Sequence, residues 1–423
     1  MTTPASTSAP VTRPTPPPAA PGTPAAPHTG GPSANAVILS SGLAYALFFG
    51  AVGAWSPYFP VYFRTLGVDL AGIGILTAIP AAVAIFVAPS WGLLADRLGD
   101  VRVPLVVSSL LAIVVALMLA TEPPVWALFP GVGLLAAGTC AMAPLVDART
   151  VSGLGAQRDR YGQARVLGSI GFIVVAIAVG LLIDAFGPRA LFAVWVPLVA
   201  AGVAAVILTF GGAGARPRVG GVGPLGALGL LRRSPFGLYF LGSVLAWTSS
   251  AGATTYFSIR LVQQGGDAGL VGVGWAVNAL VEIPMMLVFR RLAGRVGVPV
   301  LVTVGAALFG IRNVGWALAG SAQASVVVAM LSGMGFSLFL VGTTTWLADR
   351  VPAQMRATAQ ALFLGTAYAS GTILGSLGAG AIASVAGLDA MFVALAGVSA
   401  AAAVIVWFAV GRPGLGRAGA TIA

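Results

Sequence analysis

The sequence has very few residues of the types that usually carry catalysis or bind metals. It contains one histidine, one cysteine and no lysine among 423 residues. His28 lies in the N-terminal segment, so no imidazole is available to the rest of the chain, and Cys140 alone excludes an intramolecular disulfide. Clustered carboxylates suited to metal or acid–base chemistry are also missing. We therefore expect no enzymatic activity, no metal site and no cofactor.

Charge is scarce, and basic residues outnumber acidic ones 22 to 11. Charged residues make up 8% of the chain against 58% hydrophobic residues, and the net charge is +11. The basic residues are all arginines, placed singly between apolar runs without a basic face or an aromatic–basic module. This scatter argues against nucleic-acid binding. It is instead typical of a membrane protein whose arginines set its orientation.

Long continuous apolar runs dominate the sequence. Each is long enough to cross about 30 Å of hydrocarbon as a helix, and continuous rather than alternating hydrophobicity excludes barrel strands. We predict an all-α integral membrane protein in contact with lipid, with twelve spans near 37–62, 71–94, 103–120, 125–148, 165–183, 190–210, 236–258, 269–289, 299–320, 324–346, 358–382 and 390–410.

The arginine distribution predicts the orientation of these spans. Most arginines fall in the two tails, in the link after span six and in the loops after spans two, four, eight and ten, whereas Arg64, Arg189 and Arg260 fall on the other side. By the positive-inside rule, both termini are cytoplasmic in a plasma (inner) membrane protein.

The boundaries follow from the same pattern. We expect a disordered tail at 1–35, rich in proline, a six-helix bundle at 36–210, a cytoplasmic linker at 211–235, a second six-helix bundle at 236–410 and a cytoplasmic tail at 411–423.

The two halves of the chain resemble each other weakly. GLLADRLGDVRVPL (92–105) corresponds to FRRLAGRVGVPVL (289–301), and YGQARVLGS (161–169) to RATAQALFLGT (356–366). Both pairings give an offset of about 198 residues, as expected for six-helix halves related by pseudo-symmetry. Secondary transporters built this way bind their solute between the halves, near mid-membrane.

Four charged residues fall within the spans or at their ends: Asp147, Arg165, Glu282 and Arg312. A charge at a helix centre costs about 2.5–3.5 kcal/mol on insertion scales, so these side chains should face a cavity or one another. For Asp147 and Arg165, near span ends, the alternative is that they simply reach water. For Glu282 and Arg312, which we expect to lie close together, the alternative is a purely structural pair.

Aromatic and amide side chains near these charges are candidate solute contacts. Trp275, Asn278 and Glu282 share one stripe of span eight at i, i+3 and i+7. In span one, Pro57 and Pro60 should bend the outer end of the helix. Tyr58 beside them is a candidate solute contact, with an interfacial aromatic belt as the alternative.

The loop between spans two and three combines glycines, an acid and bases in a fixed order. Gly92, Asp96, Arg97, Gly99 and Arg102 stand in GLLADRLGDVR (92–102), which resembles the signature of the major facilitator superfamily. Glycines permit a tight turn and close helix approach, and the acid can accept hydrogen bonds across the interface of the halves. We interpret the loop as a cytoplasmic gate.

Several segments resemble the lactose permease group of that superfamily. They are GAWSPYFPVYFRTLG (53–67), the acid in PLVDA (144–148) with the arginine in GQARVLG (162–168), and GIRNVGW (310–316). ALVEIPMM (279–286) and RATAQALFLGTAYASG (356–371) are closer to its phenylpropionate-permease-like branch. The resemblance, over about residues 37–410, implies the major facilitator fold.

The resemblance also implies roles for single residues. Asp147 and Arg165 match the acid and base that hold the solute, and Arg312 matches an arginine implicated in coupling. The permease's helix-ten histidine and glutamate are replaced by Ser332 and Gly335, and its helix-eight acid falls near Asn278 or Ala279 rather than on Glu282. With the family's proton carrier missing, Glu282 is our first candidate for that role and Asp147 our second.

These observations favour proton-coupled import of a small organic solute by alternating access. The expected solute is an aromatic acid, a sugar-like compound or a nucleoside-like compound, and the expected active unit is a monomer. An exporter exchanging protons for a drug or secondary metabolite is the main alternative, although its helix-five Gly-Pro signature is not visible in 168–184. A membrane sensor without transport activity, a channel and a membrane enzyme fit the sequence less well.

Overall fold

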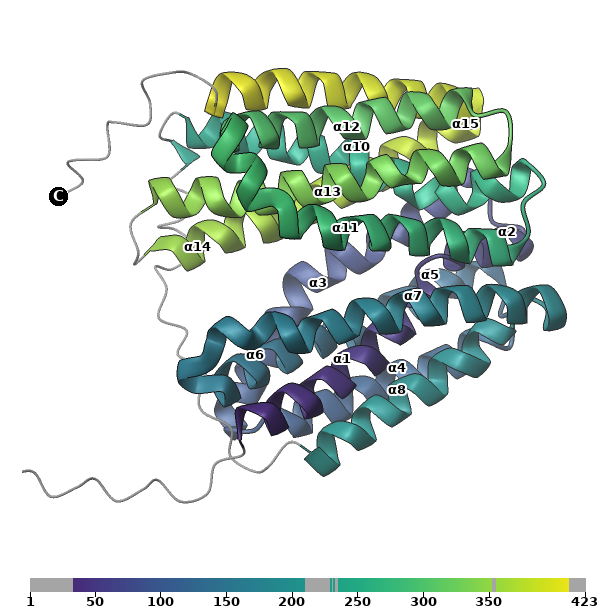
Figure 1. Ribbon diagram of the computed structural model, residues 1–423. Helices are drawn as coiled ribbons and strands as arrows, with labels where there is room; N and C mark the ends of the chain where they lie inside the picture. The colour runs from purple at the N-terminus through teal and green to yellow at the C-terminus, as the bar shows by residue number, and fades with distance from the viewer. Residues whose placement is uncertain (1–32, 210–228, 230, 233–234, 352–354, 411–423) are drawn as a thin grey trace, which may run out of the picture.

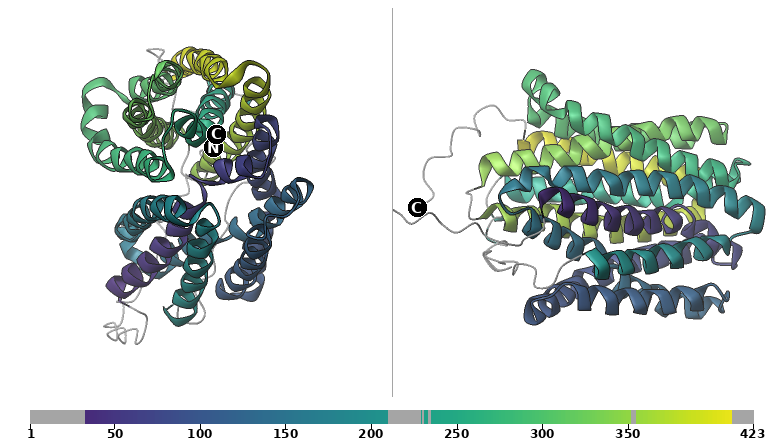
Figure 2. Two further views of the ribbon diagram at one scale, coloured as in Figure 1. Left: turned by 90° about the vertical axis from the view of Figure 1, so that its right-hand side faces the viewer. Right: turned by 60° about the horizontal axis from the view of Figure 1, so that its bottom comes forward.

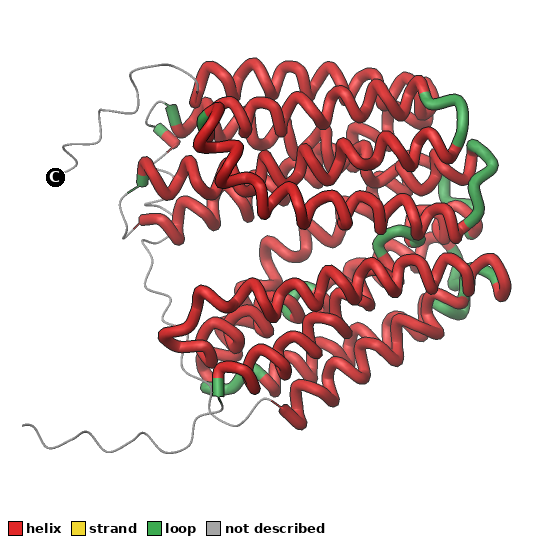
Figure 3. The backbone as a smooth tube through the Cα atoms, in the orientation of Figure 1, coloured by secondary structure: helices red, strands yellow, loops and turns green. Residues whose placement is uncertain are grey.

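The computed structural model describes residues 33–209, 229, 231–232, 235–351 and 355–410, and all regular structure in these ranges is helical (Figure 3). The main elements are α1 (Ala34–Trp55), α2 (Phe59–Thr65), α3 (Leu70–Leu98), α4 (Arg102–Leu119), α5 (Val125–Thr139), α6 (Met142–Leu154), η1 (Gly155–Arg160), α7 (Tyr161–Phe186), α8 (Ala190–Thr209), α10 (Phe236–Gln263), α11 (Ala268–Val296), α12 (Val298–Leu318), α13 (Ala322–Arg350), α14 (Arg356–Gln360), η3 (Ala361–Thr366) and α15 (Ala367–Val410).

These elements form twelve membrane-spanning helices. Within the described ranges, nine helical stretches are long and apolar enough to cross a membrane. Two of them, 125–186 and 358–410, contain two crossings each, and the less apolar α10 supplies a further one. Most of the predicted tails and linker lie outside the described residues. The exceptions are the end of the first tail, where α1 begins at Ala34, and four residues of the linker.

Breaks in the helical backbone occur at three places within the long apolar stretches. α1 ends at Trp55 and α2 begins at Phe59, which confirms the bend expected at Pro57. Span four is interrupted at Cys140 between α5 and α6. In α15, Gly387 adopts φ 84°, a left-handed conformation that glycine tolerates without strain, and this kink separates the last two spans.

The region predicted as a link between spans four and five is helical. α6 continues to Leu154, η1 follows, and α7 starts at Tyr161 rather than near 165. Asp147 therefore lies within α6 and Arg165 lies one turn inside α7. The prediction was wrong here because polar residues end a hydropathy window without ending a helix.

The first six and last six spans form two bundles that meet along two helix pairs. α7 packs on α11, and α3 packs on α15 (Figures 1 and 2). We call the end of the molecule that carries Arg64, Arg189 and Arg260 the Arg-poor end and the opposite end the Arg-rich end. In Figure 1 the helices of the two bundles converge toward the right, at the Arg-poor end, and diverge toward the left.

The apolar core follows the same division. One buried cluster runs from the N-terminal bundle into the C-terminal bundle through side chains near the Arg-poor end, among them Phe59, Tyr256, Val271 and Trp316. A second cluster, which includes Tyr239, Trp346 and Phe363, stays within the C-terminal bundle nearer the Arg-rich end. The two halves thus share a buried apolar cluster at the Arg-poor end.

Glycines set the spacing between α10 and α15. A Cβ atom added at Gly375 would lie 2.3 Å from the Thr248 carbonyl oxygen and 2.9 Å from the Gly252 nitrogen, which are backbone atoms that cannot rotate away. On the same helix, a Cβ atom at Gly378 would meet nothing within 4 Å.

This contrast gives a matched pair of variants. We expect Gly375→Ala to lower the stability of the detergent-solubilised protein by about 1–3 kcal/mol, because overpacking forces the helix backbones apart. Gly378→Ala should leave stability unchanged or raise it slightly. Thermal unfolding followed by tryptophan fluorescence measures both, and equal effects of the two variants would contradict this account.

Candidate functional site

Arg312 on α12 is the most deeply buried charged side chain among the described residues, with 1% exposure. Its Nη1 donates to Ser332 Oγ at 2.7 Å, and its Nη2 and Nε donate to Asn313 Oδ1 at 2.8 and 3.1 Å. The guanidinium also lies 4.5 Å from the centre of the Trp316 ring. The predicted Glu282–Arg312 pair is absent, because neutral oxygens satisfy Arg312 instead of a carboxylate.

The orientation of this polar network is fixed by its donors. Asn313 Oδ1 accepts from Arg312, so its Nδ2 faces Ser249 Oγ, to which it donates at 2.9 Å. Ser249 in turn donates to the Leu395 carbonyl at 2.7 Å. Ser332 accepts from Arg312, which leaves the Ser332 hydroxyl proton free to be donated elsewhere.

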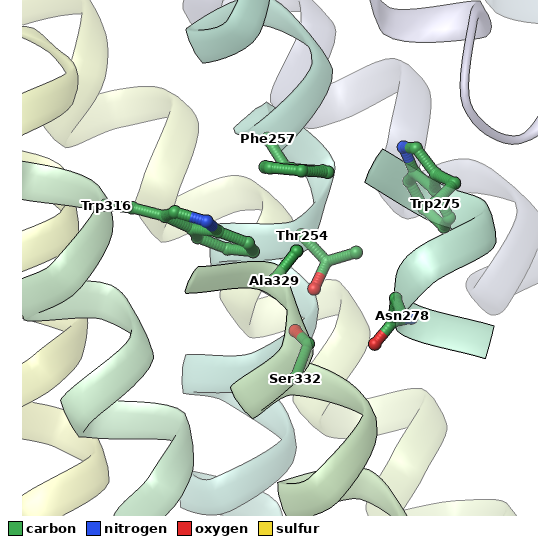
Figure 4. Close-up of a pocket in the computed structure, with 7 residues that line it drawn as sticks. All are labelled: Thr254, Phe257, Trp275, Asn278, Trp316, Ala329 and Ser332. Atoms are coloured by element: carbon green, nitrogen blue, oxygen red, sulfur yellow. The ribbon is translucent and has the colours of Figure 1, made fainter. Parts of the chain in front are cut away.

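A small pocket lies beside this network, within the C-terminal bundle (Figure 4). We call it the aromatic pocket. It is lined by Thr254, Phe257, Trp275, Asn278, Trp316, Ala329 and Ser332, and its free volume is about 10 Å³. This is room for about one water molecule, so in this conformation the pocket suits one small polar group of a solute.

Polar atoms are available at the pocket walls. Asn278 Oδ1 is buried without a hydrogen-bond partner among the described residues. Trp275 donates through Nε1 to Ser258 Oγ at 2.9 Å, and its ring faces Phe172 of α7 with centroids 6.4 Å apart. The structure therefore brings the predicted residues Trp275 and Asn278 to one pocket, with Arg312 directly behind Ser332.

In the N-terminal bundle, Asp147 is held by tyrosines. It accepts hydrogen bonds from Tyr45 at 2.5 Å and from Tyr161 at 2.8 Å. Asp147 and Arg165 form no ion pair, and the Arg165 guanidinium lies 3.8 Å from the centre of the Phe49 ring. Sequence reasoning missed both tyrosines. The position of Tyr161, four residues before Arg165, was a weak indication that it belongs to the site, whereas the sequence around Tyr45 offered no indication.

Glu282 lies across the interface between the halves from Arg165. Within the described part of the chain, its carboxylate has no hydrogen bond and no ion pair, and Arg165 is the charged residue whose field acts on it. The two residues belong to α11 and α7, the helices that pack together from opposite halves. An acid and a base thus face the interface from opposite sides.

The predicted residue Tyr58 lies away from the aromatic pocket. Tyr58 is buried at the Arg-poor end, where its hydroxyl donates to the Ala176 carbonyl. It does not line the aromatic pocket, and its role as a solute contact stays a prediction.

The predicted gate loop lies at the Arg-rich end. Gly99 ends α3 with φ 65°, which confirms the tight turn. The predicted close helix approach was wrong, because no described atom lies within 4 Å of a Cβ atom placed at Gly92 or Gly99. A hydrogen bond from Arg102 lowers the pKa of Asp100, with which it forms an ion pair at 2.7 Å. Asp96 and Arg97 have no hydrogen bond or ion pair to other described residues, so their gating role stays a prediction.

Comparison with protein families assigns the fold. The model of the MFS_1-like family matches residues 38–394, most of the chain. The chain belongs to the MFS_1-like family. It is therefore a multi-pass membrane transporter of the major facilitator type, with two pseudo-symmetric six-helix bundles.

Relatives of this MFS_1-like protein include other transporters. It is 27% identical to the maltose permease of Geobacillus stearothermophilus over 329 residues, which cover 76% of this chain and 81% of the permease. It is 23% identical over 330 residues to the uncharacterised transporter YwbF of Bacillus subtilis (strain 168), covering 75% of this chain and 80% of YwbF.

Solved structures of the same fold extend the comparison. The nucleoside transporter NupG superposes with a TM-score of 0.79 at 18% identity, covering 89% of this chain and all of NupG. A bacterial homologue of the human lysosomal transporter Spinster, in an inward-facing and unoccupied conformation, gives 0.67 at 16% identity, covering 90% and 96% of the two chains.

Double-mutant cycles test which groups hold Asp147. We expect Tyr45→Phe and Asp147→Asn to be coupled by about 0.5–3 kcal/mol in thermal unfolding, because the two side chains share a hydrogen bond. Arg165→Gln and Asp147→Asn should show a smaller coupling. Asp159→Asn, at an exposed position in η1, is the control for loss of an acid. A larger coupling with Arg165 than with Tyr45 would show that Arg165, and not the tyrosine, holds Asp147.

Proposed function

We propose that this MFS_1-like transporter imports a small organic solute together with protons by alternating access. The observation that carries the proposal is Glu282, a carboxylate in a membrane-spanning helix that has no hydrogen-bonded partner among the described residues. It lies on α11, which packs on α7, the helix of Arg165 in the other half. An acid in apolar surroundings takes up a proton unless a cation stays near it.

Movement of the halves then changes proton affinity at Glu282. Arg165 is on α7 and Glu282 is on α11, so any rocking of the two bundles alters the separation of the two charges. When the charges are close, the carboxylate is favoured, and when they separate, the protonated acid is favoured. Proton uptake on one side and release on the other follow from this alternation.

The solute would occupy the interface between Asp147 on one side and the aromatic pocket on the other. Trp275, Phe257 and Trp316 offer flat apolar walls, and Ser332 and Asn278 offer a hydrogen-bond donor and an amide. Maltose and nucleosides, named for two relatives, combine rings with hydroxyl groups, which such a site suits. Because no carboxylate in the described part of the chain neutralises Arg312, an aromatic acid is the candidate that the charge balance favours.

The proposal also includes the orientation of the protein in the membrane, its active unit and its gate. Both termini and the linker would lie in the cytoplasm of a plasma membrane protein, since the Arg-rich end faces inward by the positive-inside rule. The protein would act as a monomer, and the loop with Asp96 and Arg97 would close the Arg-rich end during transport.

Proteoliposomes with an imposed proton gradient test the coupling residue. Glu282→Gln should abolish gradient-driven accumulation of the transported solute and retain counterflow exchange, since exchange needs no net proton movement. Glu122→Gln is the matched control, because Glu122 is an exposed acid paired with Arg189 inside one half. Full accumulation by Glu282→Gln would remove Glu282 from the mechanism.

Membrane vesicles of known orientation separate import from export. We expect accumulation in right-side-out vesicles energised with an acidic exterior, because protons then move inward with the solute. Accumulation only in inverted vesicles acidified inside would identify a proton-exchanging exporter. In both preparations a protonophore should abolish accumulation.

A further inference from the structure

Asp184 joins the two halves of the transporter through backbone hydrogen bonds. It lies near the C-terminal end of α7, in the N-terminal bundle. Its Oδ1 accepts from the Ala268 amide at 2.8 Å and its Oδ2 accepts from the Gly269 amide at 2.7 Å, both in the first turn of α11 in the other bundle. The helix dipole of α11 adds to this attraction, since an anion is stabilised at a helix N-terminus.

These bonds are not ordinary capping within α11. The helix already has its own N-cap, Asp267, whose Oδ1 accepts from the Leu270 amide at 2.7 Å. Asp184 satisfies the two remaining amides that the local cap does not reach. The contact therefore serves the interface between the halves more than the helix itself.

Pseudo-symmetry shows that the other helix pair lacks this contact. Tyr58 and Tyr256 correspond, as do Asp69 and Asp267, since the members of each pair are 198 residues apart (256 − 58 and 267 − 69). Tyr256 donates to the Leu70 carbonyl at 2.7 Å, and Tyr58 lies 3.4 Å from the Ala268 carbonyl, so both tyrosines reach across the interface to the first residue of a helix in the other half.

The acid itself has no counterpart. Gly180 of α7 packs on the Ala268 carbonyl, and Gly380 of α15 packs on the Leu70 carbonyl, so the two glycines are equivalent. Asp184, four residues after Gly180, is therefore equivalent to Ser384, four residues after Gly380. Ser384 donates to Ala381 in its own helix, and no hydrogen bond from the C-terminal bundle reaches the Leu70 or Ala71 amides among the described residues. The α7–α11 side thus carries an extra, charged contact.

We propose that Asp184 is the positioning residue that keeps the Arg-poor end closed and so sets the balance between the two faces of the transporter. The proposal rests on alternating access in the proposed function. When the halves separate at this end, the two hydrogen bonds from the α11 amides to the Asp184 carboxylate break. The contact therefore stabilises only the state in which the Arg-poor end is closed. Asn in place of Asp keeps one acceptor and loses the charge.

Spin-label distances measure this balance without solute or proton gradient. In a Cys140→Ser background, one pair of cysteines at the exposed positions Gln157 and Arg295 reports on the Arg-rich end. A second pair at Trp126 and Leu318, which are 74% and 79% exposed, reports on the Arg-poor end. Each pair has one label in each bundle, so its distance reports the opening of that end.

We expect Asp184→Asn to shift the ratio of the two states by about tenfold, equivalent to about 1.4 kcal/mol, toward opening at the Arg-poor end. The Trp126–Leu318 distance should lengthen while the Gln157–Arg295 distance shortens. Asp184→Glu keeps the charge and should restore part of the shift. Glu122→Gln, which removes an acid at the same end without touching the interface, should change neither distance.

Two outcomes would overturn the proposal. The first is an unchanged pair of distances in Asp184→Asn. The second is lengthening at both ends, which indicates general loosening rather than a change of state. Because the readout needs neither transport nor a proton gradient, failure of Glu282 as the coupling residue would leave this result standing, and the reverse also holds.

Discussion

The buried guanidinium of Arg312 is the constraint on which the C-terminal half of the site depends. A charge in an apolar helix bundle requires polar partners, and here the oxygens of Asn313 and Ser332 supply them. These partners in turn fix the direction of the network through Ser249 to Leu395. α10, α12, α13 and α15 are thereby linked by one polar network that lies beside the aromatic pocket.

The interface between the halves is organised by a different requirement, the close approach of helix backbones. Gly180 and Gly272 leave room for the carbonyls of Ala268 and Ala176, and Gly74 leaves room for the Ser376 carbonyl. Each contact lies at the Arg-poor end, together with the buried cluster that joins the bundles. Side chains larger than hydrogen would separate the helices there, so these glycines allow the two bundles to pack tightly at this end.

Charge placement separates two tasks in the proposed mechanism. Arg312 and Asp147 are each surrounded by hydrogen-bonding neighbours within their own bundle, an arrangement suited to holding a solute. Glu282 and Arg165 lie on α11 and α7, which pack together from different bundles, and the two side chains form no direct bond. The energy of this arrangement changes when the bundles move. A group whose protonation depends on the conformation has to lie where the two halves meet, as Glu282 and Arg165 do.

The sequence by itself determined the membrane class, the twelve spans, the two-fold repeat and the positions of the four charged residues, because hydropathy and the insertion cost of charge act locally along the chain. It also predicted the bend at Pro57, the turn at Gly99 and the grouping of Trp275 with Asn278 on one stripe.

The tertiary structure alone decided which residues meet. Asp147 bonds to Tyr45, 102 residues away, and Asp184 reaches the first turn of α11. Glu282 forms no pair with Arg312 and lies on the helix that packs on the one carrying Arg165. Such partners are chosen by how helices from distant parts of the chain pack, and a tyrosine in an apolar run looks the same in sequence whether it faces lipid, core or carboxylate.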